Sequence, residues 1–249
     1  MDWTDEAFVL ASRPHGEGAA VVQLLTKDHG RHAGLVHGGG SASKRALVEL
    51  GNRVHATWRG RLPEHLGRLT LEVERPYAVF LMDDPKRLSA LATMCAVTEI
   101  AMPEREPHPA LFHATEVLLD SLAETAADVW QAIYIRWELG LLDELGFGLD
   151  LSACAATGHT DDLVFVSPRT GRAVSRKAGA PYEDKLLRLP GFLAPEAKAG
   201  ISASDRDIHD GLRLTGYFLT CHVFDSLNRP PPAARDRLMD LLEAGGESK

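Results

Sequence analysis

Apolar and polar positions alternate with a period of two along the first 80 residues of the chain. The alternation is clearest over residues 68–74, where three apolar residues separate four polar ones, and it recurs over residues 54–59. Shorter apolar runs at residues 8–12 and 20–26 are bounded by turns that contain glycine. This pattern indicates β-strands with one buried and one solvated face.

About five such strands, with a short helical stretch near residues 44–50, predict a small closed Greek-key barrel of the OB type, a fold that binds oligonucleotides on a strand face and adjacent loops. Phe8 and Trp58 are expected in its core, because an aromatic residue at an apolar position of a small barrel is usually buried. The outward positions beside Trp58 are mostly basic, so one face of the sheet is predicted to be cationic. They are Arg53, His55, Thr57 and Arg59.

The period becomes helical from residue 85 onward. Apolar stripes at helical spacing predict helices over residues 88–99, 111–122, 129–145, 204–227 and 233–242. Glycines 146 and 148 are expected to end the third of these, and three consecutive prolines precede the last. The sequence therefore predicts an α+β protein in which an OB domain, residues 1–80, precedes a helical domain, residues 81–249. Residues 150–195 form an irregular insertion of that domain, with a short strand at 163–166.

Composition places the chain in an ordinary globular class. Apolar residues make up 45% of its 249 residues and charged residues 25%, which excludes a disordered class. An acidic N-terminus and the lack of a long apolar run speak against a signal peptide or a membrane span. Cys95, Cys154 and Cys221 form no disulfide framework. We expect a soluble, cytoplasmic protein with reduced thiols.

Charge is distributed unevenly. The formal net charge is −8, yet residues 27–68 hold eight basic side chains against three acidic ones. A basic patch on one module of an acidic protein is typical of a surface that binds phosphate, although a solvated surface that happens to be basic is the alternative. The candidate DNA-binding residues are Lys27, Arg31, Lys44, Arg45, Arg53, Arg59, Arg61 and Arg68.

No motif indicates catalysis or a cofactor. His29, His32 and His37 do not form the His-Glu-x-x-His arrangement of a catalytic metal site, and there is no Gly-x-Ser-x-Gly turn. The glycine run at residues 38–40 lacks the Gly-Lys-Ser/Thr ending of a phosphate-binding P-loop, so a flexible loop is the favoured interpretation. The sequence predicts a protein that is not an enzyme and needs no cofactor.

Short segments in order along the chain resemble the RecO family of bacterial recombination and repair mediators. They lie at residues 7–17, 25–31, 59–61, 69–70, 137–148 and 212–222. The resemblance implies binding to single- and double-stranded DNA and annealing of complementary strands coated by single-strand-binding protein (SSB). It also implies cooperation with RecR in loading RecA. A sequence-independent, cationic surface would suit annealing, because counterion release favours any DNA backbone.

The chain departs from the family pattern at two places. A Lys-Gly-Ala-Arg-like basic loop is replaced by residues 38–45, which keep only Lys44 and Arg45. Where some members bind zinc through four cysteines, the matching positions here are Cys154, Thr157, Ser175 and Ala178. One thiolate cannot make a structural zinc site, so we expect no metal, and hydrogen bonding and packing in its place.

The resemblance also assigns a partner site. Arg136 matches a basic RecO position that contacts the acidic C-terminal tail of SSB; pairing with Asp128 or Glu138 is the alternative for this residue. A second interpretation of the whole chain is a protein-interaction adaptor whose helical domain is the working part, with incidental DNA binding. Salt separates the two, since affinity for DNA through phosphate contacts falls steeply as salt rises.

Overall fold

The computed structural model describes residues 1–39, 45–62, 64–124, 129–195 and 203–243. Their contacts divide the chain into two compact units. The first holds residues 1–123 with residues 232–238, and the second holds residues 124–231 with the residues from 239 onward.

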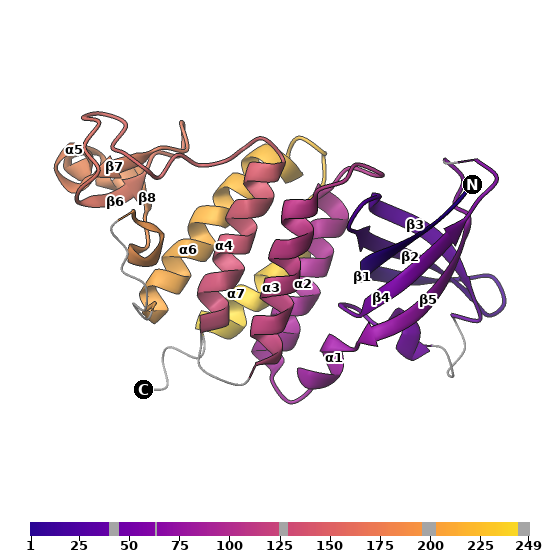
Figure 1. The fold of residues 1–249 in the computed structure, drawn as a ribbon. Helices are drawn as coiled ribbons and strands as arrows, with labels where there is room; N and C mark the ends of the chain where they lie inside the picture. Colours follow the sequence, from indigo (N-terminus) through magenta and orange to yellow (C-terminus); the bar gives the residue numbers. More distant parts are fainter. Residues whose placement is uncertain (40–44, 63, 125–128, 196–202, 244–249) are drawn as a thin grey trace. The chain divides into compact units, whose positions relative to one another are not determined.

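The first unit begins with a closed five-stranded barrel (Figure 1) whose strands are paired in the order β1-β2-β3-β5-β4. All pairs are antiparallel except β3 with β5. This order is that of an OB-type Greek-key barrel, so the predicted fold class is confirmed. The strands are β1 (Asp2–His15), β2 (Ala19–Thr26), β3 (Gly30–His37), β4 (Arg53–Arg59) and β5 (Arg68–Arg75).

The inward positions of the strands fill the barrel with side chains. Trp58 is 1% exposed inside the barrel, as predicted. Phe8 is fully buried, but it lies outside the barrel: its neighbours Ala7 and Val9 belong to the barrel core, and its own ring packs against Tyr77 and Phe112. The Trp58 indole donates from Nε1 to the backbone carbonyl of Leu66, 3.0 Å away. Gly60 and Gly67 lie against the indole so closely that a Cβ on either would overlap the ring. The indole therefore fixes the connection between β4 and β5.

Strand β1 starts six residues earlier than the apolar pattern predicts. Asp2, Thr4 and Glu6 point outward and pair across the sheet with β4. Inward and outward positions therefore alternate along this part of the strand, although two of its three outward residues are acidic. Asp5 points inward and is only 8% exposed. It accepts hydrogen bonds from the turn after β2, 2.8 Å from His29 Nδ1. Tertiary hydrogen bonding thus allows an acid where the pattern requires an apolar residue.

Helices α1, α2 and α3 follow the barrel in the first unit. Asp84 caps α2 by accepting from the backbone N–H of Lys86 and Arg87, and proline occupies its first turn. Helix α2 lies beside β1, where Cys95 Sγ is 3.6 Å from the Val9 carbonyl oxygen (Figure 1). Phe112 of α3 packs on Phe8, with ring centroids 4.9 Å apart. The helices are α1 (Tyr77–Phe80), α2 (Pro85–Ala101) and α3 (Pro109–Ala123), and the short 3-10 helix η1 (Arg45–Val48) precedes β4.

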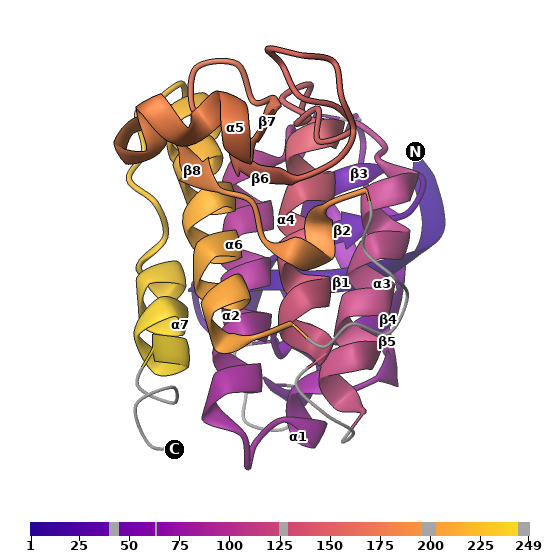
Figure 2. The same cartoon turned by 90° about the vertical axis from the view of Figure 1, so that its left-hand side faces the viewer.

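The second unit is mostly helical. Helices α4 (Val129–Glu144) and α6 (Asp205–Phe218) lie side by side, as Figures 1 and 2 both show. A buried polar cluster joins them, because Glu138 of α4 accepts hydrogen bonds from Tyr134 and from Thr215 of α6. Helix α6 continues as a π-helical turn, η4 (Leu219–Phe224). Gly146 follows α4 with φ of 82°, as predicted for a helix C-terminus.

The irregular insertion carries a three-stranded sheet in the order β7-β6-β8. Its central strand is β6 (Leu163–Val166), the short strand that the sequence predicts. The sheet and its small helices comprise β6, β7 (Ala173–Ser175), α5 (Arg176–Gly179), η2 (Ala180–Lys185), β8 (Leu187–Arg188) and η3 (Gly191–Leu193). The final helix, α7 (Ala233–Glu243), has residues in both units.

Candidate nucleic-acid interface

The outward face of β1, β4 and β5 carries charges in rows. At one end Asp2, Arg59 and Arg68 are cross-strand neighbours. A row of three threonines follows, and then His55 lies between Glu6 and Glu72. The predicted alternation along β4 is present, but the prediction that the whole face is cationic is wrong. Strands β1 and β5 place acidic side chains beside the first half of β4, which contains His55. The cationic character of the face is therefore confined to the end near Arg59.

Arg53 is surrounded by carboxylates. Its guanidinium lies 2.9 Å from Glu6 and 3.0 Å from Glu74, and it also pairs with Glu116 of α3. Burial opposes the charge, but these hydrogen bonds and charges outweigh it and raise the pKa of Arg53 above its ordinary value. The side chain is 19% exposed, so its charge is already neutralised by protein.

Arg31 is held in a similar way. Its Nε donates to the Met102 carbonyl at 2.8 Å, and one terminal nitrogen donates to Gln23 at 3.2 Å and lies 3.4 Å from Glu104. With 14% of its side chain exposed, Arg31 joins β3 to the segment after α2. Neither Arg31 nor Arg53 offers a free guanidinium to phosphate.

Arg59, Arg61 and Arg68 are exposed at the end of the barrel where β4 and β5 are connected. Arg59 and Arg68 are directly opposite each other in the sheet, an arrangement that repels unless an anion lies between them. Arg59 and Arg61 line an open hollow of about 480 Å³ together with Met1, Asp2 and Gly60. The Met1 nitrogen donates to the Gly60 carbonyl at 2.8 Å. Within the described ranges, no carboxylate forms an ion pair with these three arginines.

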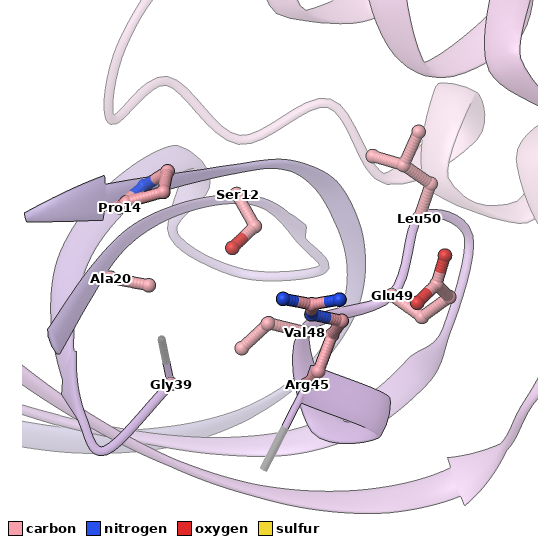
Figure 3. A pocket seen from close by; sticks show the side chains of 8 residues that line it. All are labelled: Ser12, Pro14, Ala20, Gly39, Arg45, Val48, Glu49 and Leu50. Atoms are coloured by element: carbon pink, nitrogen blue, oxygen red, sulfur yellow. The ribbon is translucent and has the colours of Figure 1, made fainter. Parts of the chain in front are cut away.

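Arg45 lies at a second hollow of the barrel, with a volume of about 310 Å³. Figure 3 shows its guanidinium and the Ser12 hydroxyl pointing into this space from opposite sides. Ala20 and Val48 provide apolar walls. Lys44, the other candidate of this loop, lies outside the described residues. Lys27 is half-buried in the turn between β2 and β3.

Arg105 is a further cation of this surface, and it lies outside the basic segment of residues 27–68. It follows α2, yet its backbone N–H donates to the Arg31 carbonyl at 2.9 Å and its guanidinium donates to the Glu64 carbonyl at 3.0 Å. The side chain is exposed beside the β4–β5 connection. A φ of 61° distinguishes the residue in the structure. No pattern in the sequence predicts that a residue about 40 positions away joins this surface.

Four aromatic rings gather at the same end of the barrel. Trp3 stacks between Trp58 and His29, at centroid distances of 6.0 and 4.4 Å and interplanar angles of 13° and 12°. His32 meets both indoles edge-on, at 5.0 and 5.1 Å. His32 is 4% exposed, and its ring nitrogens have no hydrogen-bond partner among the described residues.

Acid should destabilise the protein through His32. Burial, reinforced by the nearby charges of Arg105 and His29, lowers the pKa of His32 to about 4 from 6.5. Between pH 6.5 and about 4, His32 is therefore protonated in the unfolded chain but remains neutral in the folded chain. The unprotonated His32 therefore costs the folded protein no stability above pH 6.5, but the free energy of unfolding falls as pH drops toward 4, by about 2–3 kcal/mol at pH 4.5. Urea unfolding at pH 7 and 4.5 should show this loss for the wild type and a loss smaller by that amount for His32→Phe. Equal losses of unfolding free energy in the wild type and in His32→Phe would show that His32 is not the residue that makes the protein sensitive to acid.

Three of the four positions that match the zinc site converge in the second unit. Cys154 Sγ lies 3.5 Å from Ser175 Oγ and accepts from the Ser175 backbone N–H at 3.3 Å. Although burial opposes it, hydrogen bonds from Ser175, Thr157 and the backbone lower the pKa of the Cys154 thiol to about 6. The described residues contain no cluster of three or more metal-ligating side chains. Hydrogen bonds between Cys154 and Ser175 connect the two parts of this loop.

Arg136 is exposed on α4. Its guanidinium donates to the Phe192 carbonyl at 2.8 Å and lies 5.8 Å from the centre of the Phe192 ring. Glu138, one alternative partner, instead belongs to the buried cluster with Tyr134 and Thr215, and Asp128 lies outside the described residues. The turn η3 thus orients Arg136.

The barrel order and the exposed cations define the class: an OB-fold protein with a helical region after the barrel. Family models described as "Recombination protein O N terminal" and "Recombination protein O C terminal" match residues 1–77 and 82–231. Over 242 residues the chain is 55% identical to the DNA repair protein RecO of Rhodospirillum centenum, covering 96% of this chain and 94% of the relative. It is 53% identical to the DNA repair protein RecO of Phenylobacterium zucineum over 99% of both chains. The chain therefore belongs to the RecO family of DNA repair proteins.

The matching family descriptions indicate no enzymatic family. Among the helices of the described residues, none has the length and apolar character that crossing a membrane requires.

Proposed function

We propose that this protein binds single- and double-stranded DNA through the β4–β5 end of its barrel and anneals complementary strands. It helps RecR to load RecA onto SSB-coated DNA, and it needs neither catalysis nor a cofactor. The observation that carries the proposal is the opposed pair Arg59 and Arg68 beside the hollow with Arg61. Asp2 is the cross-strand neighbour of Arg59, but these three arginines form no ion pair with a carboxylate among the described residues.

The proposed DNA site differs from the set of basic residues that the sequence suggests. Arg59, Arg61, Arg68 and Arg105 form its centre, and Arg45 and Lys27 supply peripheral cations. We leave Arg31 and Arg53 out because protein groups already bind their guanidinium groups. Such a surface contacts phosphates without reading bases, which suits annealing of any complementary pair.

Replacing Arg59 and Arg61 together by alanine should weaken binding to all single-stranded sequences alike. If each arginine contacts one phosphate, the slope of log affinity against log salt should become shallower by about 1.4. Arg206→Ala with Arg237→Ala removes the same charge from exposed positions of α6 and α7 and should leave the slope unchanged. Fluorescence anisotropy at several salt concentrations measures both. An unaltered slope in the first variant would place the DNA site elsewhere, and no DNA binding by wild type at low salt would favour an adaptor.

SSB recruitment is the second part of the proposal. The tail of bacterial SSB is acidic and ends in an apolar residue with a free carboxylate, so its site must combine an apolar contact with a cation. Arg136 supplies the cation: it is exposed, and the Phe192 carbonyl orients its guanidinium. Arg136→Ala should weaken binding of an SSB tail peptide by about 1.5–3 kcal/mol, the contribution of a charged hydrogen bond. Anisotropy titration measures this, with Arg206→Ala as the control. Equal affinity of wild type and Arg136→Ala would remove Arg136 from the site.

A further inference from the structure

A parallel stack of three rings runs from the barrel core to its surface. Trp58 is fully inside, Trp3 is half-buried, and His29 ends the stack in the turn between β2 and β3. The His29 side chain remains 36% exposed although Trp3 covers one of its faces. The stack therefore ends on a ring that is partly exposed at the surface.

Hydrogen bonds hold the outermost ring in place. His29 Nδ1 lies 2.8 Å from Asp5 Oδ2, and the same carboxylate oxygen accepts from the Asp28 backbone N–H at 2.8 Å. The His29 backbone N–H donates to Thr26 Oγ1 at 3.0 Å. Beneath the stack, His32 supports both indoles edge-on. A ring fixed in this way loses little conformational freedom when a further ring stacks on it.

We infer that the exposed face of His29 is a platform on which one unpaired base of single-stranded DNA stacks. This inference rests on the proposed DNA binding and adds a contact to a base. A flat π-face suits any base, so the platform preserves indifference to sequence. Lys27 lies two residues before His29 in the turn, and Arg59 follows Trp58 on β4, so cations that could bind the flanking phosphates are close to the stack along the chain. A stack needed only to close the barrel would end on a covered ring.

The platform requires unpaired DNA. In a duplex the faces of the bases are occupied by their neighbours, so His29 contributes to single-stranded binding alone. The phosphate contacts at Arg59 and Arg61 serve both forms. The platform would therefore bind one base of a single strand before that strand pairs with its complementary strand.

Two matched probes separate stacking from phosphate contacts: a 15-nucleotide oligothymidine and a 15-nucleotide chain of abasic tetrahydrofuran sites with the same phosphates. Wild type should bind the oligothymidine at least fivefold more tightly than the abasic chain, the effect of about one stacked base. His29→Asn removes the ring but keeps a group that can hydrogen-bond to Asp5. It should bind both probes equally, at the wild-type affinity for the abasic chain. His29→Phe keeps a ring and should retain the preference for bases.

Equal binding of both probes by wild type, or a preference that His29→Asn retains, would overturn the platform. So would a loss of the preference in both His29 variants while thermal unfolding shows them folded. In the first case, steep salt dependence would leave the proposed DNA binding standing. Failure of wild type to bind either probe at low salt would overturn both proposals together. The Arg59→Ala, Arg61→Ala double variant should weaken both probes alike and keep their ratio.

Discussion

Replacing Trp58 by alanine should lower the free energy of unfolding by about 3–5 kcal/mol, the usual cost of truncating a large buried aromatic residue. The indole is 1% exposed, contacts Trp3 and His32, and donates to the Leu66 carbonyl. Alanine would leave a cavity at this end of the barrel and would leave that carbonyl without its donor. Urea unfolding followed by circular dichroism measures the change without relying on tryptophan fluorescence.

A Trp58→Phe variant is the matched control. It keeps most of the buried ring and loses the hydrogen bond, so the expected loss is about 1–2 kcal/mol. The alanine variant should also weaken DNA binding at temperatures where it is folded, because Gly60 and Gly67 rest on the indole and position the connection that carries Arg61. A loss in Trp58→Ala no larger than that in Trp58→Phe would show that the indole does not organise the connection.

A Gly30→Ala change should destabilise the protein by about 3 kcal/mol, from two sources. Gly30 has a φ of 66°, a left-handed conformation that costs an alanine about 1 kcal/mol. Its Cβ would also overlap the backbone of Glu106, so the segment after α2 would have to leave β3, at an overpacking cost of about 2 kcal/mol. The hydrogen bond from the Arg105 N–H to the Arg31 carbonyl would be lost with it.

Gly16→Ala separates the two sources. Gly16 also has a positive φ, of 56°, but a Cβ there would meet nothing within 4 Å. It should therefore cost about 1 kcal/mol, the conformational part alone. Thermal or urea unfolding of the two variants gives the difference. Equal destabilisation would mean that the close approach of Gly30 and Glu106 carries no energetic weight.

The connection after α2 links these stability effects to function. Residues 104–106 run along the end of β3, where Arg31 and Glu104 form a β-bridge. They hold Arg105 beside the β4–β5 connection. Displacing them by Gly30→Ala should thus reduce affinity for DNA as well as stability, whereas Gly16→Ala should affect stability alone.

Local sequence determined the elements of this protein. Alternation over residues 53–59 and 68–75 matches β4 and β5 closely, because the two faces of a strand differ in burial at every second residue. Helical spacing located α2, α3 and α4 in the same way, and Gly146 marked the end of α4. Residues 2–7 were missed as a strand because their outward positions are acidic and Asp5 is buried by hydrogen bonds from a turn more than 20 residues later.

Only the tertiary structure decided which basic side chains are free of acidic partners and can therefore bind phosphate. Arg53 and Arg59 are equivalent in the sequence, since both are outward arginines of one strand. Arg53 pairs with acids from β1, β5 and α3, up to 63 residues away, while Arg59 lies opposite a second arginine. The His29 stack and Arg105 likewise depend on chain segments that meet only in the fold. Ion pairing and ring stacking act over a few ångströms in space, so the order of residues along the chain does not determine them.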